Sequence, residues 1–515
     1  MKGLETTVAG WTLIATTLSA SSLFGASSLE QLAAEKFGHL TPAESRLLRS
    51  APTGDTAWCG PSANTADPSN DPSHAATWGQ TRTVRSALVR WLYADPRAVP
   101  QIAVSGVSVG GAFLDGRLDL SRIKTDLPLQ LLRSAVPKGI DLSESDIRLL
   151  DLGGSSTGDI SASNLLVRGE LLLNHGFQAD GAVNLDGSKI RGTLDARGAK
   201  ILSGGQYAFS LVTANVDGDV LFQDAQTNNM IRLSLSSVGG NLSFIRAGFD
   251  GRATGLEAIN TQVRGVLAWV NIKPKHPNIT LDLTFARVGA LADDADSWPT
   301  WILMNEFSYD KFDEPENIPK DLESRLAWLQ KQSPFRPQPY LQLSKVFRGM
   351  GNDDFATSVL IVKDKRQREE DARRTGILLR PVQLCWSWFL RSTMGYGYAP
   401  IRAFGWTVAI VTLGWIVFVR GYRAGFIVPS EKDACASFTA TRDVPAYYPP
   451  FSGFIYSLET FLPFVELHQA KYWLPVRKRV PLARLLPWYL RLHILSGWVL
   501  STLLVAGLTG LLHKD

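Results

Sequence analysis

Residues 140–162 read IDLSESDIRLLDLGGSSTGDISA and decide the fold of the polar part of the chain, because an apolar-x-apolar pair recurs in them. The pairs Ile140/Leu142, Leu150/Leu152 and Ile160/Ala162 start 10 residues apart. Toward both ends of the chain the pair continues at steps of 10 to 12 residues, in Leu118/Leu120, Leu129/Leu131, Leu171/Leu173, Val183/Leu185 and Leu194/Ala196. After one longer step it resumes in Phe209/Leu211, Val220/Phe222, Ile231/Leu233 and Leu242/Phe244.

This pattern predicts a mainly β protein with a solenoid over residues 101–292. Period-2 alternation in pieces this short indicates strands, and the Gly, Asn and Asp residues between the pieces indicate turns. A single turn of such a chain cannot bury its own apolar face, so successive turns must stack on one shared core. At two pairs per turn, roughly 190 residues predict about nine turns.

The repeat resembles a degenerate pentapeptide-repeat protein. Its step is near twice five, and small residues stand two positions before large apolar ones, as Ala112 stands before Leu114. The resemblance implies a right-handed β-helix. An antiparallel β-sandwich, which also has short strands at 8 to 12 residue spacing, is the alternative. The single motif shared by all units favours the solenoid.

The 515-residue chain is 45% hydrophobic and 20% charged overall. These values mix two different parts, a polar and glycine-rich part before about residue 376 and a part rich in Trp and Leu after it. The net charge is +5, and the basic residues cluster near the apolar runs. This predicts the lipid bilayer as the anionic partner, and no nucleic acid. Cys59, Cys385 and Cys435 lie far apart or in apolar sequence, so we expect no disulfide framework, metal site or cofactor.

Two segments flank the predicted solenoid. Residues 1–100 are expected to form a helical or loop segment that caps it, and within them 8–26 (VAGWTLIATTLSASSLFGA) is either a signal peptide or a packed helix. Residues 293–376 show helical spacing, as in Leu322, Leu326 and Leu329, and resemble a single tetratricopeptide-like hairpin. One hairpin cannot form a peptide-binding superhelix, so it is predicted to join the solenoid to the C-terminal part.

Residues 377–515 are predicted to form a membrane domain with two spans. Residues 403–419 and 492–512 are apolar and near the length that crosses a bilayer, and Trp473, Trp488 and other aromatic residues flank them. The segment 449–467 (PPFSGFIYSLETFLPFVEL) is too short and too polar to cross, which predicts a re-entrant or interfacial segment.

Within this segment, residues 454–461 (FIYSLETF) resemble the pore helix of two-span potassium channels. A carbonyl-rich filter should follow, but Leu462-Pro463-Phe464-Val465-Glu466 follows instead, and a proline removes a backbone donor. The filter-like string Thr393–Tyr398 precedes the first span.

Glu459 and Glu466 are candidate functional residues because carboxylates at membrane depth are costly. Their alternative role is at the lipid headgroups, on an interfacial helix.

The basic residues on the two sides of the predicted membrane domain are nearly equal in number, so they give only a weak indication of its orientation. Residues 363–402 hold nine basic residues, and the loop 420–491 holds ten. With no strong signal peptide, we expect a bacterial inner-membrane protein with a cytoplasmic solenoid.

Three strings resemble catalytic or metal motifs without their context. Gly106–Gly110 (GVSVG) matches a nucleophile elbow, but a solenoid rung follows it instead of a helix. Trp58–Pro61 (WCGP) is similar to a thioredoxin site, but Ser62 stands where the second thiol is needed. The Asp-rich piece Asp67–Asp71 consists of ordinary turn formers. We therefore expect no catalytic residue.

The whole chain resembles a little-characterised family of bacterial membrane proteins. The resemblance rests on residues 78–96, the solenoid, and residues 324–366, 392–400 (STMGYGYAP) and 456–475 (YSLETFLPFVELHQAKYWLP). Members are often labelled membrane-associated oxidoreductases, and this sequence contains no redox motif to match that label. The first functional hypothesis is a non-enzymatic scaffold that presents the solenoid to a protein partner. The others are an oligomeric membrane pore and a redox enzyme.

Overall fold

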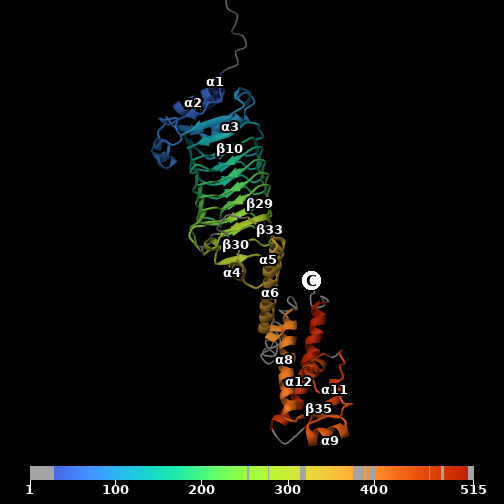
Figure 1. Cartoon of the computed structure of the whole chain (residues 1–515). Helices are drawn as coiled ribbons and strands as arrows, with labels where there is room; N and C mark the ends of the chain where they lie inside the picture. The colour runs from blue at the N-terminus through green and yellow to red at the C-terminus, as the bar shows by residue number, and fades with distance from the viewer. Residues whose placement is uncertain are drawn as a thin grey trace, which may run out of the picture. The chain divides into compact units, whose positions relative to one another are not determined.

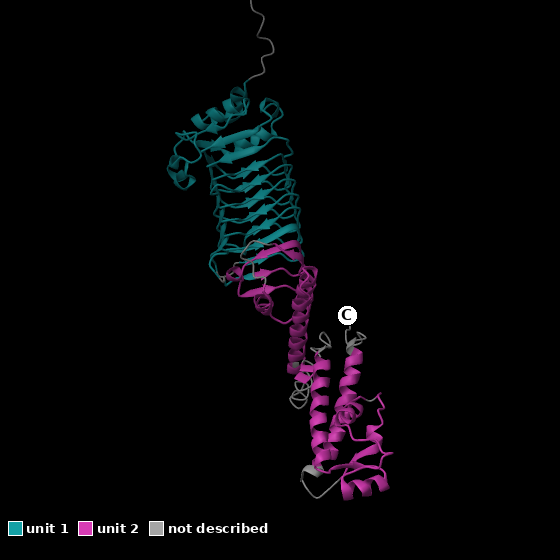
Figure 2. Ribbon diagram, viewed as in Figure 1, with its two compact units in different colours: residues 1–280 teal, residues 281–515 magenta. Residues whose placement is uncertain are grey.

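The computed structural model of the chain describes residues 28–251, 255–275, 278–313, 321–374, 388–389, 392–393, 401–462, 464–476 and 481–508. The apolar segment 8–26, Cys385 and the string 394–398 lie outside these residues. The chain divides into two compact units, residues 1–280 and 281–515, coloured separately in Figure 2.

The first unit begins with helices that cover one end of a β-solenoid. They are α1 (Leu29–Phe37), α2 (Pro42–Ser50) and α3 (Ser86–Ala94), with short 3-10 turns η1 (Pro68–Asn70), η2 (Pro72–Thr77) and η3 (Val99–Gln101). A capping box starts α1 and another starts α2. The fully buried Glu44 accepts hydrogen bonds from the backbone and guanidinium of Arg85, with Arg85 Nε 2.7 Å from Glu44 Oε1. This ion pair ties α2 to β2.

The solenoid consists of parallel strands, four to a turn, in about nine turns (Figure 1). In one turn, β10 is followed by β11, β12 and β13, and β14 then pairs with β10, with Leu150 opposite Leu171. The strands of the first face are β1 (Ala57–Trp58), β3 (Val107–Gly110), β6 (Leu129–Leu132), β10 (Leu150–Asp151), β14 (Leu171–Leu172), β18 (Leu194–Asp195), β22 (Val220–Leu221) and β26 (Leu242–Ser243). Those of the second are β2 (Thr83–Arg85), β4 (Phe113–Asp115), β7 (Ala135–Val136), β11 (Ser156–Thr157), β15 (Gln178–Ala179), β19 (Lys200–Ile201), β23 (Gln226–Thr227) and β27 (Gly248–Phe249).

The third and fourth faces complete each turn. The third has β5 (Leu118–Asp119), β8 (Ile140–Asp141), β12 (Ile160–Ser161), β16 (Val183–Asn184), β20 (Tyr207–Ser210), β24 (Met230–Arg232), β28 (Gly255–Glu257), β30 (Thr280–Asp282) and β32 (Trp301–Leu303). The fourth has β9 (Asp146–Ile147), β13 (Leu166–Val167), β17 (Lys189–Ile190), β21 (Asn215–Val216) and β25 (Ser237–Val238). The longer β29 (Gln262–Trp269) pairs with both β25 and β26.

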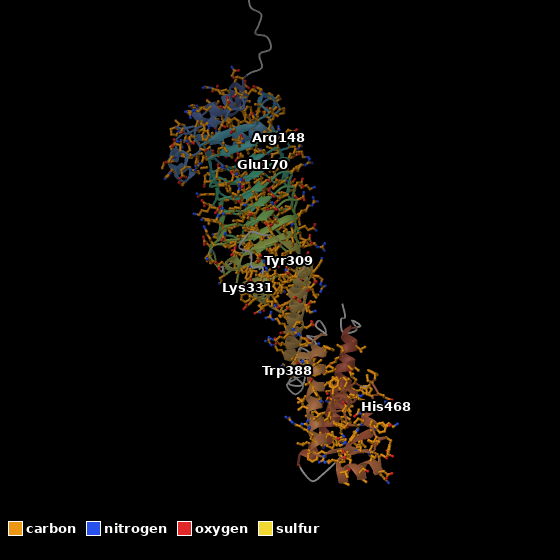
Figure 3. All side chains as sticks on the ribbon, in the orientation of Figure 1. Arg148, Glu170, Tyr309, Lys331, Trp388 and His468 are labelled. Carbon is orange, nitrogen blue, oxygen red and sulfur yellow. The ribbon has the colours of Figure 1, made fainter. Side chains whose placement is uncertain are left out.

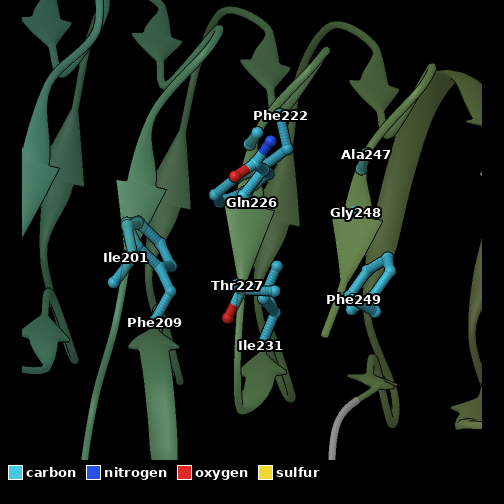
Figure 4. A pocket seen from close by; sticks show the side chains of 10 residues that line it. Ile201, Phe209, Phe222, Gln226, Thr227, Ile231, Ala247, Gly248 and Phe249 are labelled. Carbon is cyan, nitrogen blue, oxygen red and sulfur yellow. The ribbon is translucent and has the colours of Figure 1, made fainter. Parts of the chain in front are cut away.

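The sequence pairs form the core, as predicted. Every member of the twelve pairs is buried, and the pairs fall alternately on the first and third faces. The step of 11 residues is therefore half a turn. The rings of Phe209, Phe222, Phe244 and Trp269 form a row of contacts in the interior, with neighbouring centroids 5.0 to 5.5 Å apart. Figure 4 shows Phe209 and Phe222 among the side chains that line a small void in this core. The void measures only about 10 Å³, so the side chains around it are closely packed.

Buried hydroxyls join successive turns. Ser155 Oγ donates to the carbonyl of Leu131 (2.6 Å) and accepts from the amide of Ser134 (2.9 Å), one turn earlier. We expect Ser155→Ala to lower the free energy of unfolding by about 1–3 kcal/mol, since both backbone groups lose their buried partner. Urea unfolding of the purified protein measures this. Ser143→Ala is the control, because the half-buried Ser143 hydroxyl has no partner among the described residues. Equal losses in both variants would contradict the expectation.

Each turn also needs a residue in the left-handed region at its corners. After the third face these residues include Glu144, Asn164 and Gly187, with φ of 58°, 57° and 71°. After the first face they include Arg133 (48°) and Gly154 (67°). The corners thus project side chains where the residue is not glycine, and leave a recess where it is.

The second unit contains the last strands and a helical connector. β31 (Arg287–Asp293) and β33 (Ser308–Phe312) pair in parallel, so strands continue past residue 292. η4 (Ala295–Ser297) lies between them in sequence, and α4 (Leu322–Gln330), α5 (Gln338–Gly349) and α6 (Asp353–Arg374) follow. α5 packs on β33 and on α6. The predicted helical spacing after residue 321 is confirmed.

The C-terminal part contains α8 (Ile401–Arg423), α9 (Lys432–Thr441), α10 (Gly453–Phe461), α11 (Gln469–Tyr472) and α12 (Pro481–Leu508). Strands β34 (Ile427–Pro429) and β35 (Trp473–Pro475) form an antiparallel pair. The segments Arg402–Arg423 and Leu485–Ala506 are long and apolar enough to cross a membrane, which agrees with the prediction of two spans. The second segment begins at residue 485, earlier than the predicted 492, and residues 509–512 of the prediction lie outside the described residues. Trp488 is exposed, as an interfacial residue should be, but Trp473 is fully buried against Tyr422, Phe438 and Phe451, so its assignment to an aromatic belt was wrong.

Candidate functional site

The short helix α10 lies against both long helices, which also pack on each other (α8 and α12 in Figure 1). The Ser452 side chain caps its first turn by accepting a hydrogen bond from the backbone amide of Ile455. Its Tyr456, Ser457 and Phe461 are buried, whereas Phe454 and Ile455 are exposed. The segment predicted to be re-entrant therefore contains a helix held between the two predicted spans.

Three glycines permit this close packing. A Cβ on Gly497 of α12 would overlap the backbone carbonyl of Phe461, at the end of α10. A Cβ on Gly453 of α10 would overlap the side chain of Val419 on α8, and one on Gly414 of α8 would overlap the hydroxyl of Ser457. Only glycine lets the three backbones approach this far, as in other closely packed helices.

A buried polar cluster connects the three helices. Ser457 Oγ on α10 donates to the carbonyl of Val411 on α8 (2.8 Å). Nε2 of His493 on α12 lies 3.2 Å from Ser457 Oγ and 3.1 Å from the Ser457 carbonyl oxygen. His493 is only 2% exposed, and the rings of Phe418, Phe461 and Tyr489 surround it. Buried Nδ1 of His493 has no hydrogen-bond partner in the described part of the chain. In the sequence, His493 is noticeable only because it interrupts an apolar run.

Glu459 holds the two ends of the segment together. Its Oε2 accepts hydrogen bonds from the backbone amides of Gln469 (2.7 Å) and Ala470 (3.0 Å), at the start of α11. The Gln469 side chain accepts from the amide of Ser452 (3.1 Å) and donates to the carbonyl of Pro450 (3.2 Å). Residues 469–470, which follow the loop after α10, therefore lie beside residues 450–452, which precede α10. Glu459 positions this return.

Glu466 has a different environment. It is exposed, with its neighbours Phe464 and Leu467, on the segment that follows α10 and ends at His468 (Figure 3). Phe464 is 76% exposed. No ion pair of Glu466 occurs among the described residues. The structure therefore does not bring the two candidate carboxylates into one cluster: Glu459 accepts hydrogen bonds from backbone amides, and Glu466 is exposed.

We expect Glu459→Ala to destabilise the C-terminal part by about 1.5–3 kcal/mol, because it removes two hydrogen bonds to an ionised acceptor. Glu466→Ala is the matched control and should leave stability unchanged. Thermal unfolding of the full chain in detergent, followed by tryptophan fluorescence, compares them. A larger loss for Glu466→Ala would contradict the assigned roles.

The catalytic look-alikes occupy structural positions. Ser108 lies inside β3, is 4% exposed, and its hydroxyl is 2.8 Å from that of Thr56, so it is not on a strained turn. Cys59 is buried, and its burial raises the pKa of the thiol to about 11, opposite to a reactive cysteine.

The acidic string also has a structural role. The Asp67 carboxylate accepts a hydrogen bond from the backbone amide of Ser69 and caps η1. The Asp71 carboxylate accepts one from the amide of Ser73 and caps η2. Within the described ranges no three His, Cys, Asp or Glu side chains group as a metal site would need.

In comparisons with protein-family models, with curated proteins and with solved structures, nothing matches this chain. The solenoid and the two apolar helices agree with the architecture that the family resemblance implies. The family's activity stays a prediction.

Proposed function

We propose that this chain is an integral membrane protein whose C-terminal part assembles with further copies around a pore. α8 and α12 cross the bilayer in this proposal, and α10 re-enters between them. Each span of 22 residues extends about 33 Å as a helix, enough for the hydrocarbon core. Large apolar side chains on both helices face outward, among them Leu413 (53% exposed) and Leu492 (63% exposed). Such exposure suits lipid better than water.

The observation that carries the proposal is the depth of α10. It contacts Val411 and Gly414 near the middle of one apolar helix, and His493 and Gly497 near the middle of the other. The segment after it, residues 462 and 464–468, is therefore close to the bilayer centre and is not helical. Non-helical backbone at that depth is stable only when protein covers it or water-filled space adjoins it. A closed ring of subunits provides both.

Oligomeric state is the first consequence to check. Native mass determination in mild detergent should show a closed homo-oligomer, and crosslinks should join residues of the exposed segment 464–468. A monomer in every detergent tested would contradict the proposal. Ion flux into liposomes then tests conduction itself.

The proposed orientation places the protein in the bacterial inner membrane with the solenoid in the cytoplasm. Cys435 lies on α9, in the loop between the two apolar helices, and is partly exposed. A membrane-impermeant maleimide added to spheroplasts should label the chain, and Cys435→Ser should abolish the label. Labelling of Cys435 only after lysis would reverse the orientation.

A scaffold role for the solenoid stays a prediction, as does redox activity. Affinity purification from native membranes tests the first through recovery of a protein that binds the solenoid. An absorbance spectrum of the purified chain tests the second, because a bound flavin or haem would give a visible band.

A further inference from the structure

One corner of the solenoid is hollowed where two glycines follow β10. Gly153 and Gly154 stack on Leu132 and Arg133 of the previous turn and on Asn174 and His175 of the next, as the bonds from Arg133 N to Gly153 O and from Gly154 N to Asn174 O show. The missing side chains leave a cavity of about 350 Å³. Thr65 and Ala66 of the N-terminal loop line its other side. This volume is in the range of small-molecule sites.

A hydrogen-bonded row of side chains orients one wall. Arg197 Nη2 donates to Asp195 Oδ2 (2.7 Å), which also accepts from Asn174 Nδ2 (2.8 Å). Asn174 Oδ1 is 2.6 Å from His175 Nδ1. An amide oxygen only accepts, so Nδ1 of His175 is the donor in this bond. Asn174 is 7% exposed and Asp195 is 3% exposed, so this row is fixed by the fold.

Two further side chains bring opposite charges to the same cavity. Asp151 is half-buried, and its carboxylate accepts the amide of Gly153 (2.8 Å). Its burial raises the pKa of the carboxyl above its ordinary value, although the Gly153 amide and the neighbouring His175 act in the opposite direction. Arg133 is half-buried, and no salt bridge of its guanidinium occurs among the residues that the structure describes, although its charge interacts with Asp71 of the N-terminal loop. Asp151 and Arg133 both line the cavity without bonding to each other.

We infer that this cavity binds a small zwitterion, a free α-amino acid, with its ammonium group on Asp151 and its carboxylate on Arg133. Leu132 and Leu172 at the cavity wall contact the apolar part of such a ligand. A separated acid and base, neither of them in a salt bridge within the described part of the chain, complement one ammonium and one carboxylate. A neutral polyol would leave both charges unpaired. The inference does not depend on the proposed pore.

Calorimetric titration of the full chain in detergent with the common amino acids tests it. Saturable binding of one or more is expected. Arg133→Gln and Asp151→Asn should each weaken binding by about tenfold or more, since each removes a charged partner. Gly153→Leu should abolish binding without changing a charge, because a Cβ there points at Asp151 Oδ1 (3.0 Å) and Asn174 Oδ1 (3.4 Å), into the cavity.

Arg122→Gln is the matched control, because Arg122 occupies a similar left-handed position (φ 61°) at another corner and pairs with Glu144. It should bind as the wild type does. Two analogues of the bound amino acid, the amine without its carboxylate and the carboxylic acid without its ammonium group, should each bind about tenfold more weakly than the amino acid itself. The inference is overturned if no amino acid binds at millimolar concentration, or if Arg133→Gln and Asp151→Asn, with unchanged unfolding temperatures, bind as tightly as the wild type.

Discussion

Arg325→Ala is expected to lower the free energy of unfolding by about 3–5 kcal/mol, because it leaves a buried carboxylate without its counter-ion. Arg325 lies on α4 and is 0% exposed. Its Nη1 and Nη2 donate to the two carboxylate oxygens of Asp293, at 2.9 and 2.8 Å. The guanidinium carbon also lies 3.8 Å from the ring centroid of Phe312. The pair therefore fastens the first connector helix to the end of β31.

Thermal and urea unfolding of the full chain measure this loss. Arg348→Ala is the control, because Arg348 forms an exposed pair with Asp353 at 3.8 Å and should cost under about 1 kcal/mol. The double variant Arg325→Met, Asp293→Leu should recover part of the stability, since it removes both buried charges. If Arg325→Ala unfolds like the wild type, the pair does not hold the connector.

Gly497→Val is expected to abolish ion flux and to lower the unfolding temperature of the C-terminal part. The added side chain meets the carbonyl of Phe461, a backbone atom that cannot rotate away. α10 must then move out of its place between α8 and α12. Overpacking of this kind costs about 1–3 kcal/mol or more.

Gly405→Ala on α8 is the control for helix glycines, because a Cβ at Gly405 has no described atom within 4 Å. It should retain flux and unfold at the same temperature or slightly higher. Flux and unfolding temperature are measured on the same preparations. Wild-type flux in a correctly folded Gly497→Val protein would show that the packing of α10 does not matter for conduction.

The core of the solenoid could be predicted from the sequence because its repeat is local. Ile140 and Leu142 are buried by the same alternation that makes them a pair, and stacking repeats this every half turn. The spans and the helices of residues 322–374 could be predicted for the same reason. The second face of the turn could not, because some of its buried residues are small or polar, such as Thr157 and Ala179, and give a weak hydrophobic signal.

The polar sites could not be predicted, because they join residues that are far apart in the chain. Arg325 and Asp293 are 32 residues apart, and Arg325 looks like a surface residue of an amphipathic helix. Ser457 and His493 are 36 residues apart. Glu459 could be identified as unusual, but its bonds to α11 depend on the chain returning beside Pro450. A cavity lined by residues from Thr65 to His175 leaves no motif at all.

Conduction by the purified full chain, reconstituted into liposomes loaded with a fluorescent ion indicator, tests the central proposal most directly. The proposed pore requires flux that rises with the amount of assembled oligomer, persists in Gly405→Ala and is lost in Gly497→Val. Sealed liposomes that hold correctly folded, oligomeric wild-type protein and yet pass neither cations nor anions would contradict it.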